Sequence, residues 1–149
     1  MSFQNQFTKT TTDANLMETV HHGSAEYPFR YYYENIALFD FKCIDWHWHS
    51  ELEFIYIESG NVVFDIGTVH FELNEGNGIM INSKILHRLQ SSSDAIIPNF
   101  LFQPSFIAPQ DSLIYKKYIN PVISSSLEYL VFQPDIPWQK KALEIIKTI

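Results

Sequence analysis

Short runs of alternating hydrophobic and polar residues occupy the middle of the chain, from Phe29 to Phe102. These runs are rich in β-branched and aromatic residues and are separated by turn signals, a pattern typical of an all-β fold. Gly60 and Gly67 each lie between two such runs, where a residue with positive φ closes a hairpin at little cost. We therefore predict β-strands at residues 29–33, 36–43, 52–58, 62–66, 68–73, 78–81, 96–102 and 127–132.

Helical signals follow the β-rich region. Pro109 can open a short helix over residues 109–119, and Pro121 is expected to end it because proline lacks the backbone N–H that a helix interior uses. A second helix is predicted over residues 135–149. Its apolar residues recur four, three and four positions apart and form one seam, Trp138, Ala142, Ile145 and Ile149. Such a seam packs against its own domain or pairs with a second copy of the chain.

The segment before the first strand is polar and rich in Thr, Asn, Gln and Ser. We interpret residues 1–26 as an arm, in which His21 and His22 are expected to be solvated loop residues. Residues 27–134 then form a β-barrel domain, and residues 135–149 begin a further helix. Because no Gly, Asn or Pro ends that helix, we expect the natural protein to continue after Ile149.

Composition narrows the class of protein. A chain of 149 residues, 46% hydrophobic and 15% aromatic, is long enough for one domain with a full core and is not disordered. A formal charge of −7 repels phosphate backbones, so these residues are not expected to bind DNA by themselves. The single cysteine, Cys43, cannot form an intrachain disulfide. We find no membrane-spanning run and no secretory signal, and we expect a cytoplasmic protein without a membrane partner.

The stretch from residue 45 to residue 53 carries the candidate chemistry. His47, His49, Glu51 and Glu53 have the same parity, so an extended backbone places their side chains on one face. Imidazole and carboxylate groups together suit a divalent transition metal such as Zn, Ni, Fe or Mn. His87, near the end of a predicted strand, is the candidate for a further ligand.

Trp46 and Trp48 have the parity opposite to that of the histidines. On a regular strand they therefore point away from the candidate ligands. We expect them to pack on the outside of the sheet or against the following helices, in preference to stacking on a sugar.

This stretch resembles the first conserved motif of the cupin superfamily, and a later stretch resembles the second. The matching positions are His47, His49, Glu53 and Gly60 in the first motif and Gly76 and His87 in the second. Scaffold positions differ, since Phe41, Asn82, Lys84 and Ser91 replace the family's Gly, Pro, Gly and Asn. The resemblance implies a mainly β, double-stranded β-helix (jelly-roll) barrel, and the spacing to Gly60 favours Glu53 over Glu51 as the carboxylate ligand.

Residues 47–53 and 73–83 also resemble the N-terminal domains of AraC-type transcription regulators. In that family a helical region used for dimerisation follows the cupin, and a helix-turn-helix domain then binds DNA. The resemblance implies an effector-sensing and dimerisation domain, with DNA bound only through a domain outside these residues. The implied ligand-binding residues are His47, His49, Glu53 and His87, with Arg30 as a candidate partner for a carboxylate or phosphate of the effector.

Two alternatives stay open at this stage. The same four residues could serve a metal-dependent cupin enzyme, such as a dioxygenase, isomerase or decarboxylase. They could also form a buried polar network without any metal, in a domain that only pairs subunits. No cofactor is therefore certain. A sugar, a carboxylate metabolite and a metal chelate would each suit a pocket of this composition.

The apolar seam of the last helix generates a first prediction. If Trp138, Ala142, Ile145 and Ile149 pair with a second copy, the purified chain forms a dimer in solution. Light scattering at high protein concentration measures this directly. A mass near 17.4 kDa, that of one chain, would rule out self-association through the seam.

Overall fold

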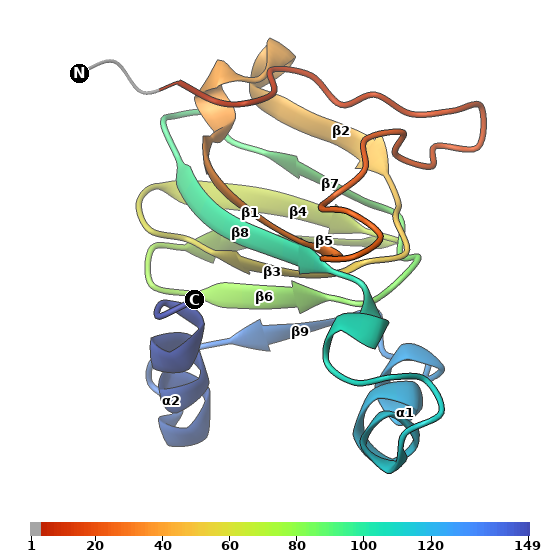
Figure 1. The fold of residues 1–149 in the computed structure, drawn as a ribbon. Helices are drawn as coiled ribbons and strands as arrows, with labels where there is room; N and C mark the ends of the chain where they lie inside the picture. Colours follow the sequence, from red (N-terminus) through yellow and green to blue (C-terminus); the bar gives the residue numbers. More distant parts are fainter. Residues whose placement is uncertain (1–3) are drawn as a thin grey trace.

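The computed structural model describes residues 4–149, which form two antiparallel β-sheets facing each other (Figure 1). In the order of their pairing, the five-stranded sheet contains β1 (Phe29–Asn35), β8 (Ile96–Phe102), β3 (Leu52–Tyr56), β6 (Gly78–Ile81) and β9 (Tyr129–Phe132). The four-stranded sheet contains β2 (Cys43–His47), β7 (His87–Gln90), β4 (Asn61–Ile66) and β5 (Val69–Asn74). The expectation of a mainly β fold followed by helices is confirmed.

The main hydrophobic core lies between the two sheets and follows from strand alternation. On β4, Val62, Phe64 and Ile66 are all fully buried in this core. On β3, Ile55 belongs to the same core, whereas Leu52 and Phe54 belong to a different cluster. Because side chains alternate along a strand, the face of β3 that carries Ile55 also carries Glu53. A carboxylate is thus directed into the apolar space between the sheets.

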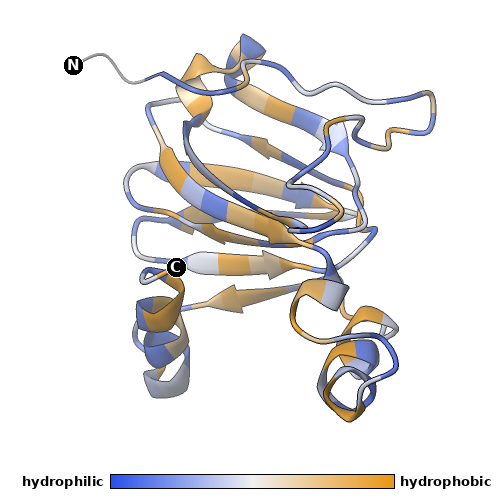
Figure 2. Cartoon of the chain, viewed as in Figure 1, coloured by the Kyte–Doolittle hydropathy of each residue, from blue (hydrophilic) through white to orange (hydrophobic). Residues whose placement is uncertain are grey.

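A second hydrophobic layer covers the outer face of the five-stranded sheet. Its buried members come from four strands and one helix and are Leu52, Met80, Phe100, Phe102, Phe132 and Leu143. The helices α1 (Asn120–Ile123) and α2 (Pro137–Ile146) lie on this side of the molecule, and Figure 2 shows their apolar residues among polar ones. Strand β3 is therefore apolar on both faces, apart from the buried Glu53.

The prediction of a strand at residues 36–43 is wrong. Two 3-10 turns replace it, η1 (Ile36–Leu38) and η2 (Asp40–Lys42), and β2 begins only at Cys43. The Asn35 side chain accepts a hydrogen bond from the Ala37 backbone and so starts the first turn. Phe41 has a φ of 59°, which no strand residue adopts. The sequence analysis also missed β7.

The helix predicted at residues 109–119 is displaced. A π-helical segment, η4 (Tyr115–Ile119), runs directly into α1 and so passes through Pro121, which was expected to end it. The backbone N–H of Asn120 donates to the carbonyl of Tyr115, five residues earlier. Pro121 therefore falls in the first turn of α1, where its missing N–H is not needed.

The predicted seam of the last helix divides between two environments. Leu143 is buried on the second layer, and Ala142 and Ile146 pack beside it. Trp138 and Ile145 are 58% and 57% exposed, and Ile149, just past the helix, is 61% exposed. Ala142 thus faces its own domain, and the Trp138 ring contacts Phe132 edge-on while staying largely exposed. Pairing of the exposed seam residues with a second copy stays a prediction. Within residues 4–149, no helix has the length and hydrophobicity needed to span a membrane.

The two hairpin glycines offer a test of the β-meander. Gly60 and Gly67 have φ of 81° and 56°, so any side chain strains both. A Cβ on Gly60 would collide with the backbone carbonyl of Asp94, whereas a Cβ on Gly67 meets only the flexible carboxylate of Glu128, at 3.0 Å. We expect Gly67→Ala to lower the free energy of unfolding by about 1–2 kcal/mol, and Gly60→Ala to lower it at least twice as much. Urea denaturation gives both values, and equal losses would contradict the assignment of backbone crowding to Gly60.

Candidate functional site

Four ionisable side chains converge in the core between the sheets. His47 ends β2, His49 follows it, Glu53 lies on β3 and His87 begins β7. All are buried, with exposed fractions of 4%, 3%, 7% and 0%. One ligand atom from each lies within 4.8 Å of the others. Nε2 of His49 and Nε2 of His87 are each 3.1 Å from Oε2 of Glu53. We call this set the His–Glu cluster.

Backbone carbonyls fix the orientation of all three imidazoles. Nδ1–H of His47 donates to the carbonyl of Asp45 at 2.7 Å, and Nδ1–H of His87 donates to that of Ile85 at 2.7 Å. Nδ1–H of His49 donates to the carbonyl of Glu51 at 3.1 Å. Because a carbonyl can only accept, each Nδ1 carries the proton and each Nε2 is turned toward the cluster. This is the arrangement by which proteins hold histidine ligands of a metal.

The charges in the cluster are strongly coupled. Burial acts to raise the pKa of Glu53, but hydrogen bonds with His49 and His87 hold it well below its usual value. Burial acts to lower the pKa of His49, yet the hydrogen bond and charge of Glu53 raise it. Burial, reinforced by His87, lowers the pKa of His47 to about 3. Glu53 is therefore ionised, and the Nε2 lone pair of His47 is free at neutral pH.

The donor set fits a divalent transition metal. Three imidazole nitrogens and one carboxylate oxygen suit Zn, Ni, Fe or Mn. Glu51, the other carboxylate of the same parity, lies beside Nδ1 of His49 at 3.7 Å, on the side of the ring away from the cluster. Of the two glutamates, the structure brings only Glu53 to the other three side chains.

The N-terminal arm contributes to the site, which the sequence analysis did not foresee. His22, expected to be solvated, is only 7% exposed. Its Nε2–H donates to Oε2 of Glu18 at 2.7 Å, and its Nδ1 lies 2.7 Å from the hydroxyl of Tyr32. Its ring centre is 5.8 Å from that of His49. The polar composition of the arm carried no signal for this burial, because Tyr32 and His49 lie outside the arm.

Trp48 holds the arm in place. Its backbone N–H donates to the carbonyl of Leu16, and its carbonyl accepts from the N–H of Glu18. Its indole N–H donates to the carbonyl of Asn15 at 2.9 Å. The guanidinium carbon of Arg88 lies 5.1 Å from the centre of the Trp46 ring. Neither tryptophan belongs to the His–Glu cluster, and Trp48 contacts the arm instead of the sheet or helices expected from its parity.

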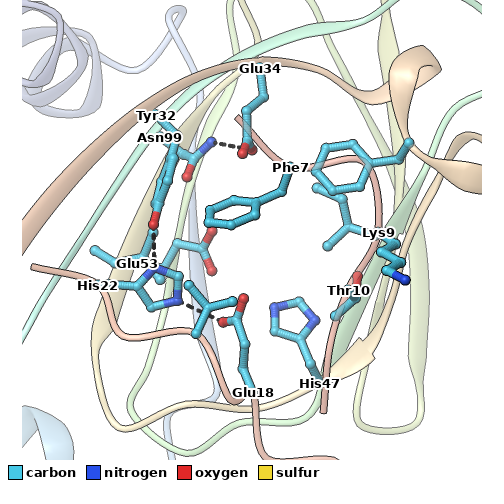
Figure 3. Close-up of a pocket in the computed structure, with 14 residues that line it drawn as sticks. Phe7, Lys9, Thr10, Glu18, His22, Tyr32, Glu34, His47, Glu53 and Asn99 are labelled. Atoms are coloured by element: carbon cyan, nitrogen blue, oxygen red, sulfur yellow. Dashed lines mark hydrogen bonds and ion pairs between the residues drawn. The ribbon is translucent and has the colours of Figure 1, made fainter. Parts of the chain in front are cut away.

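A small cavity of about 50 Å³ opens beside the His–Glu cluster (Figure 3). By volume it holds a few water molecules. Its polar lining comes from the arm and both sheets, namely Lys9, Thr10, Glu18, His22, Tyr32, Glu34, His47, Glu53 and Asn99, and its apolar lining is Phe7, Val20, Phe39, Ile44 and Leu101. Arg30 is not among these residues; it is exposed and donates to Oε1 of Gln6 at 3.0 Å. The structure thus does not bring Arg30 to the other candidate ligand-binding residues.

Glu34 is the carboxyl group of this cavity that sequence analysis overlooked. It is 7% exposed, and Oε2 accepts from Nδ2 of Asn99 at 3.2 Å. Burial raises its pKa from 4.5 to about 7. Glu34 is a charged residue within a strand, between Tyr33 and Asn35, and this could have marked it as a functional residue. The hydrophobic alternation of β1 is too weak for the sequence to show that the Glu34 side chain points inward.

Glu34 makes stability depend on pH in a direction that can be tested. The folded state holds the proton more tightly than the unfolded state, so the stability contributed by neutral Glu34 is lost as pH rises from about 4.5 to about 7. We expect Glu34→Gln to raise the free energy of unfolding by about 2–3 kcal/mol at pH 8, with little change at pH 4.5. Glu72→Gln, an exposed position on β5, is the control. A gain at Glu34 that does not vary with pH would contradict the buried-carboxyl assignment.

Comparisons with known proteins agree with this geometry. Residues 39–109 match the AraC-like ligand binding domain. Over 140 residues the chain is 32% identical to the uncharacterized HTH-type transcriptional regulator YdeC of Bacillus subtilis (strain 168), covering 92% of this chain and 47% of that protein. The chain thus spans about half the length of this relative.

Similar solved structures include a cupin superfamily protein from Desulfitobacterium hafniense DCB-2, with 11% identity, a TM-score of 0.48, and coverage of 54% of this chain and 71% of that one. A cupin-2 domain containing protein from Shewanella frigidimarina NCIMB 400 has 13% identity, a TM-score of 0.45, and coverage of 51% and 72%. The two facing antiparallel sheets described above make the fold mainly β and cupin-like. By sequence, residues 39–109 match an AraC-like ligand-binding domain, and most of the chain is similar to about half of an HTH-type transcriptional regulator.

Proposed function

We propose that this domain senses a small-molecule effector in its barrel and controls a DNA-binding domain that lies outside these residues. The observation that carries the proposal is a cavity lined by buried ionisable groups, within a domain that matches an AraC-like ligand binding domain. Buried charged groups are costly unless they are paired or bind something, so their concentration around one cavity favours a binding role. The similarity to a helix-turn-helix regulator supplies the link to DNA.

The arm gives effector binding a route to a change in structure. Phe7, Glu18 and His22 all belong to the arm and line the cavity. An effector larger than the present 50 Å³ must displace part of this lining. The arm is hydrogen-bonded to the backbone of Trp48, which directly follows β2. Displacing the arm would break these hydrogen bonds, so the domain would have two distinct arrangements, one with the arm bound and one with it displaced. An effector shifts the equilibrium between them by its differential affinity.

A metal ion is part of the proposal. His47, His49, Glu53 and His87 would hold a divalent transition metal, which would act as a Lewis acid toward an oxygen or nitrogen of the effector. The protein's own part is to orient the three Nε2 atoms and to keep Glu53 ionised. Without a metal, His47 and Glu53 act as polar groups of the pocket, and His49 and His87 hydrogen-bond to Glu53.

The remaining partners belong to the same proposal. The exposed Trp138, Ile145 and Ile149 would contact a second copy in a homodimer. DNA would be bound only by the domain outside these residues, and the protein would work in the cytoplasm. Thermal melts of the purified chain against a metabolite library, followed by a transcription reporter with the full-length regulator, test the sensing role. Compounds that stabilise the chain are expected to change reporter activity.

A metal-dependent cupin enzyme is the second candidate function. The observation that favours it is the complete donor set of three histidines and one glutamate. Oxygen uptake or substrate turnover that requires the metal would establish an enzyme. The regulator similarity favours sensing, because a sensor needs reversible binding and no chemical step.

Comparing a variant of a candidate metal ligand with a variant of its neighbour in the sequence distinguishes loss of the metal site from a general loss of structure. We expect His49→Ala to weaken metal binding at least tenfold, because it removes a buried Nε2 from the donor set. Trp48→Phe keeps the donor set and is expected to change metal affinity less than about twofold, a negligible free energy. Elemental analysis after dialysis against graded chelator gives both values, and acidification to below the usual histidine pKa is expected to release the metal. Equal losses in the two variants would contradict the assignment of His49.

A further inference from the structure

The cavity has a second polar end, across from His47. Glu34 and Asn99 lie on one side of it, whereas His47 and Glu18 lie on the opposite side (Figure 3). Glu34 and Asn99 come from adjacent strands, β1 and β8, of the five-stranded sheet. Both are buried, with exposed fractions of 7% and 3%. Neither has been given a role by the metal site.

Two acceptor oxygens at this end of the cavity take no part in the hydrogen bonds between Glu34, Asn99 and Ile97. The amide of Asn99 uses one N–H for Oε2 of Glu34, at 3.2 Å, and the other for the carbonyl of Ile97, at 2.9 Å. Oε1 of Glu34 and Oδ1 of Asn99 have no partner in these bonds. Among residues 4–149, no side-chain oxygen or nitrogen that is sealed from solvent lacks a partner. The two oxygens are therefore open to the cavity, and a ligand group must donate to them.

Charge specifies the kind of donor. Glu18, Glu34 and Glu53 all line the cavity. Among the lining residues, the permanently basic side chain is Lys9, which is exposed on the arm. Glu18 is paired with His22, and Glu53 is paired with His49 and His87, whereas the side-chain partner of Glu34 is the neutral Asn99. In a space of low dielectric a carboxylate at the position of Glu34 attracts a cation and repels an anion. An ammonium group has three N–H donors and a positive charge, so it satisfies both requirements, whereas a hydroxyl group satisfies only the first.

Size and apolar lining restrict the remainder of the ligand. A volume of about 50 Å³ accommodates only a few non-hydrogen atoms while the arm stays in place. Phe7 and Leu101 line the same cavity and suit a methyl or methylene group, and an aromatic face also attracts a cation.

We propose that Glu34 and Asn99 form an amine-recognition end of the cavity, so that the effector presents a small primary alkylammonium group. This inference rests on the proposed sensing function and specifies its ligand class. The sequence analysis considered an effector with a carboxylate or phosphate bound by Arg30, whereas this inference assigns the effector a positive charge.

Binding of matched small molecules tests the inference. The probes are methylammonium and ethanolamine as cations, methanol and ethylene glycol as neutral analogues, and acetate and phosphate as anions. Calorimetric titration and thermal melts at pH 7.5 and constant ionic strength are made on the chain with its metal content measured. We expect the two amines to bind and raise the midpoint, and the other four probes to have no effect at the same concentration.

Two variants and one control locate the binding. Glu34→Gln preserves the shape of the side chain but removes its charge and is expected to weaken amine binding at least tenfold. Asn99→Ser removes the amide oxygen and is expected to weaken amine binding by a smaller factor. This second variant gives an independent readout. Glu72→Gln removes one carboxylate from the exposed face of β5 and is expected to bind amines as the parent chain does.

The outcomes separate this inference from the proposed function. Equal amine affinity in Glu34→Gln and the parent chain overturns the inference, as does the absence of any amine binding. Stabilisation by the anions or the neutral analogues alone also overturns it, but the sensing function then stands if His49→Ala abolishes that stabilisation. If no library compound stabilises the chain and the full-length regulator responds to none, the sensing function itself fails.

Discussion

The structure of the site depends on three backbone carbonyls that accept from the Nδ1 atoms of buried histidines. These bonds force every Nε2 toward Glu53, so that lone pairs and a carboxylate meet in a space otherwise filled by isoleucine, valine and phenylalanine. Such an arrangement is electrostatically unfavourable unless positive charge lies between the acceptors. Protons provide that charge in part, as the raised pKa of His49 shows. A divalent cation would provide it more completely, since it reaches all four acceptors at once.

The arm determines what else can enter this space. It contributes Glu18 and His22 to the lining and is held by the backbone of Trp48, one residue from each of two cluster histidines. Any ligand that presses on the arm therefore also strains the strand end that positions His47 and His49. The coupling requires no long pathway, because the arm, β2 and the cluster are in direct contact. At the end of β2, His47 thus lines the cavity, and Trp48, the next residue, holds the arm that covers it.

The sequence was sufficient for the features that depend on local alternation and spacing. Motif spacing singled out His47, His49 and Glu53, and the hairpin glycines marked the meander. Parity alone did not predict their arrangement, because His47 and Glu53 lie on strands of the two facing sheets and not on one extended face. It was insufficient where distant segments decide the environment. His22 packs against His49, and Glu34 accepts a hydrogen bond from Asn99 of β8. The turns at residues 36–42 and the helix through Pro121 arise from side-chain capping and a π-helical step, which periodicity does not report.

The two hydrophobic layers explain why the site can be both buried and coupled to the helices. Glu53 lies between Leu52 and Phe54, which pack in the outer layer beneath α2 and the α1 segment, while its own side chain enters the inner core. Displacing Glu53 along β3 would therefore disturb the packing of its neighbours against Phe100 and Phe102. Because packed layers resist gradual deformation, we expect a displacement of Glu53 to move β3 as a unit. A barrel interior and an external helical face are thus joined by one strand with hydrophobic residues on both sides.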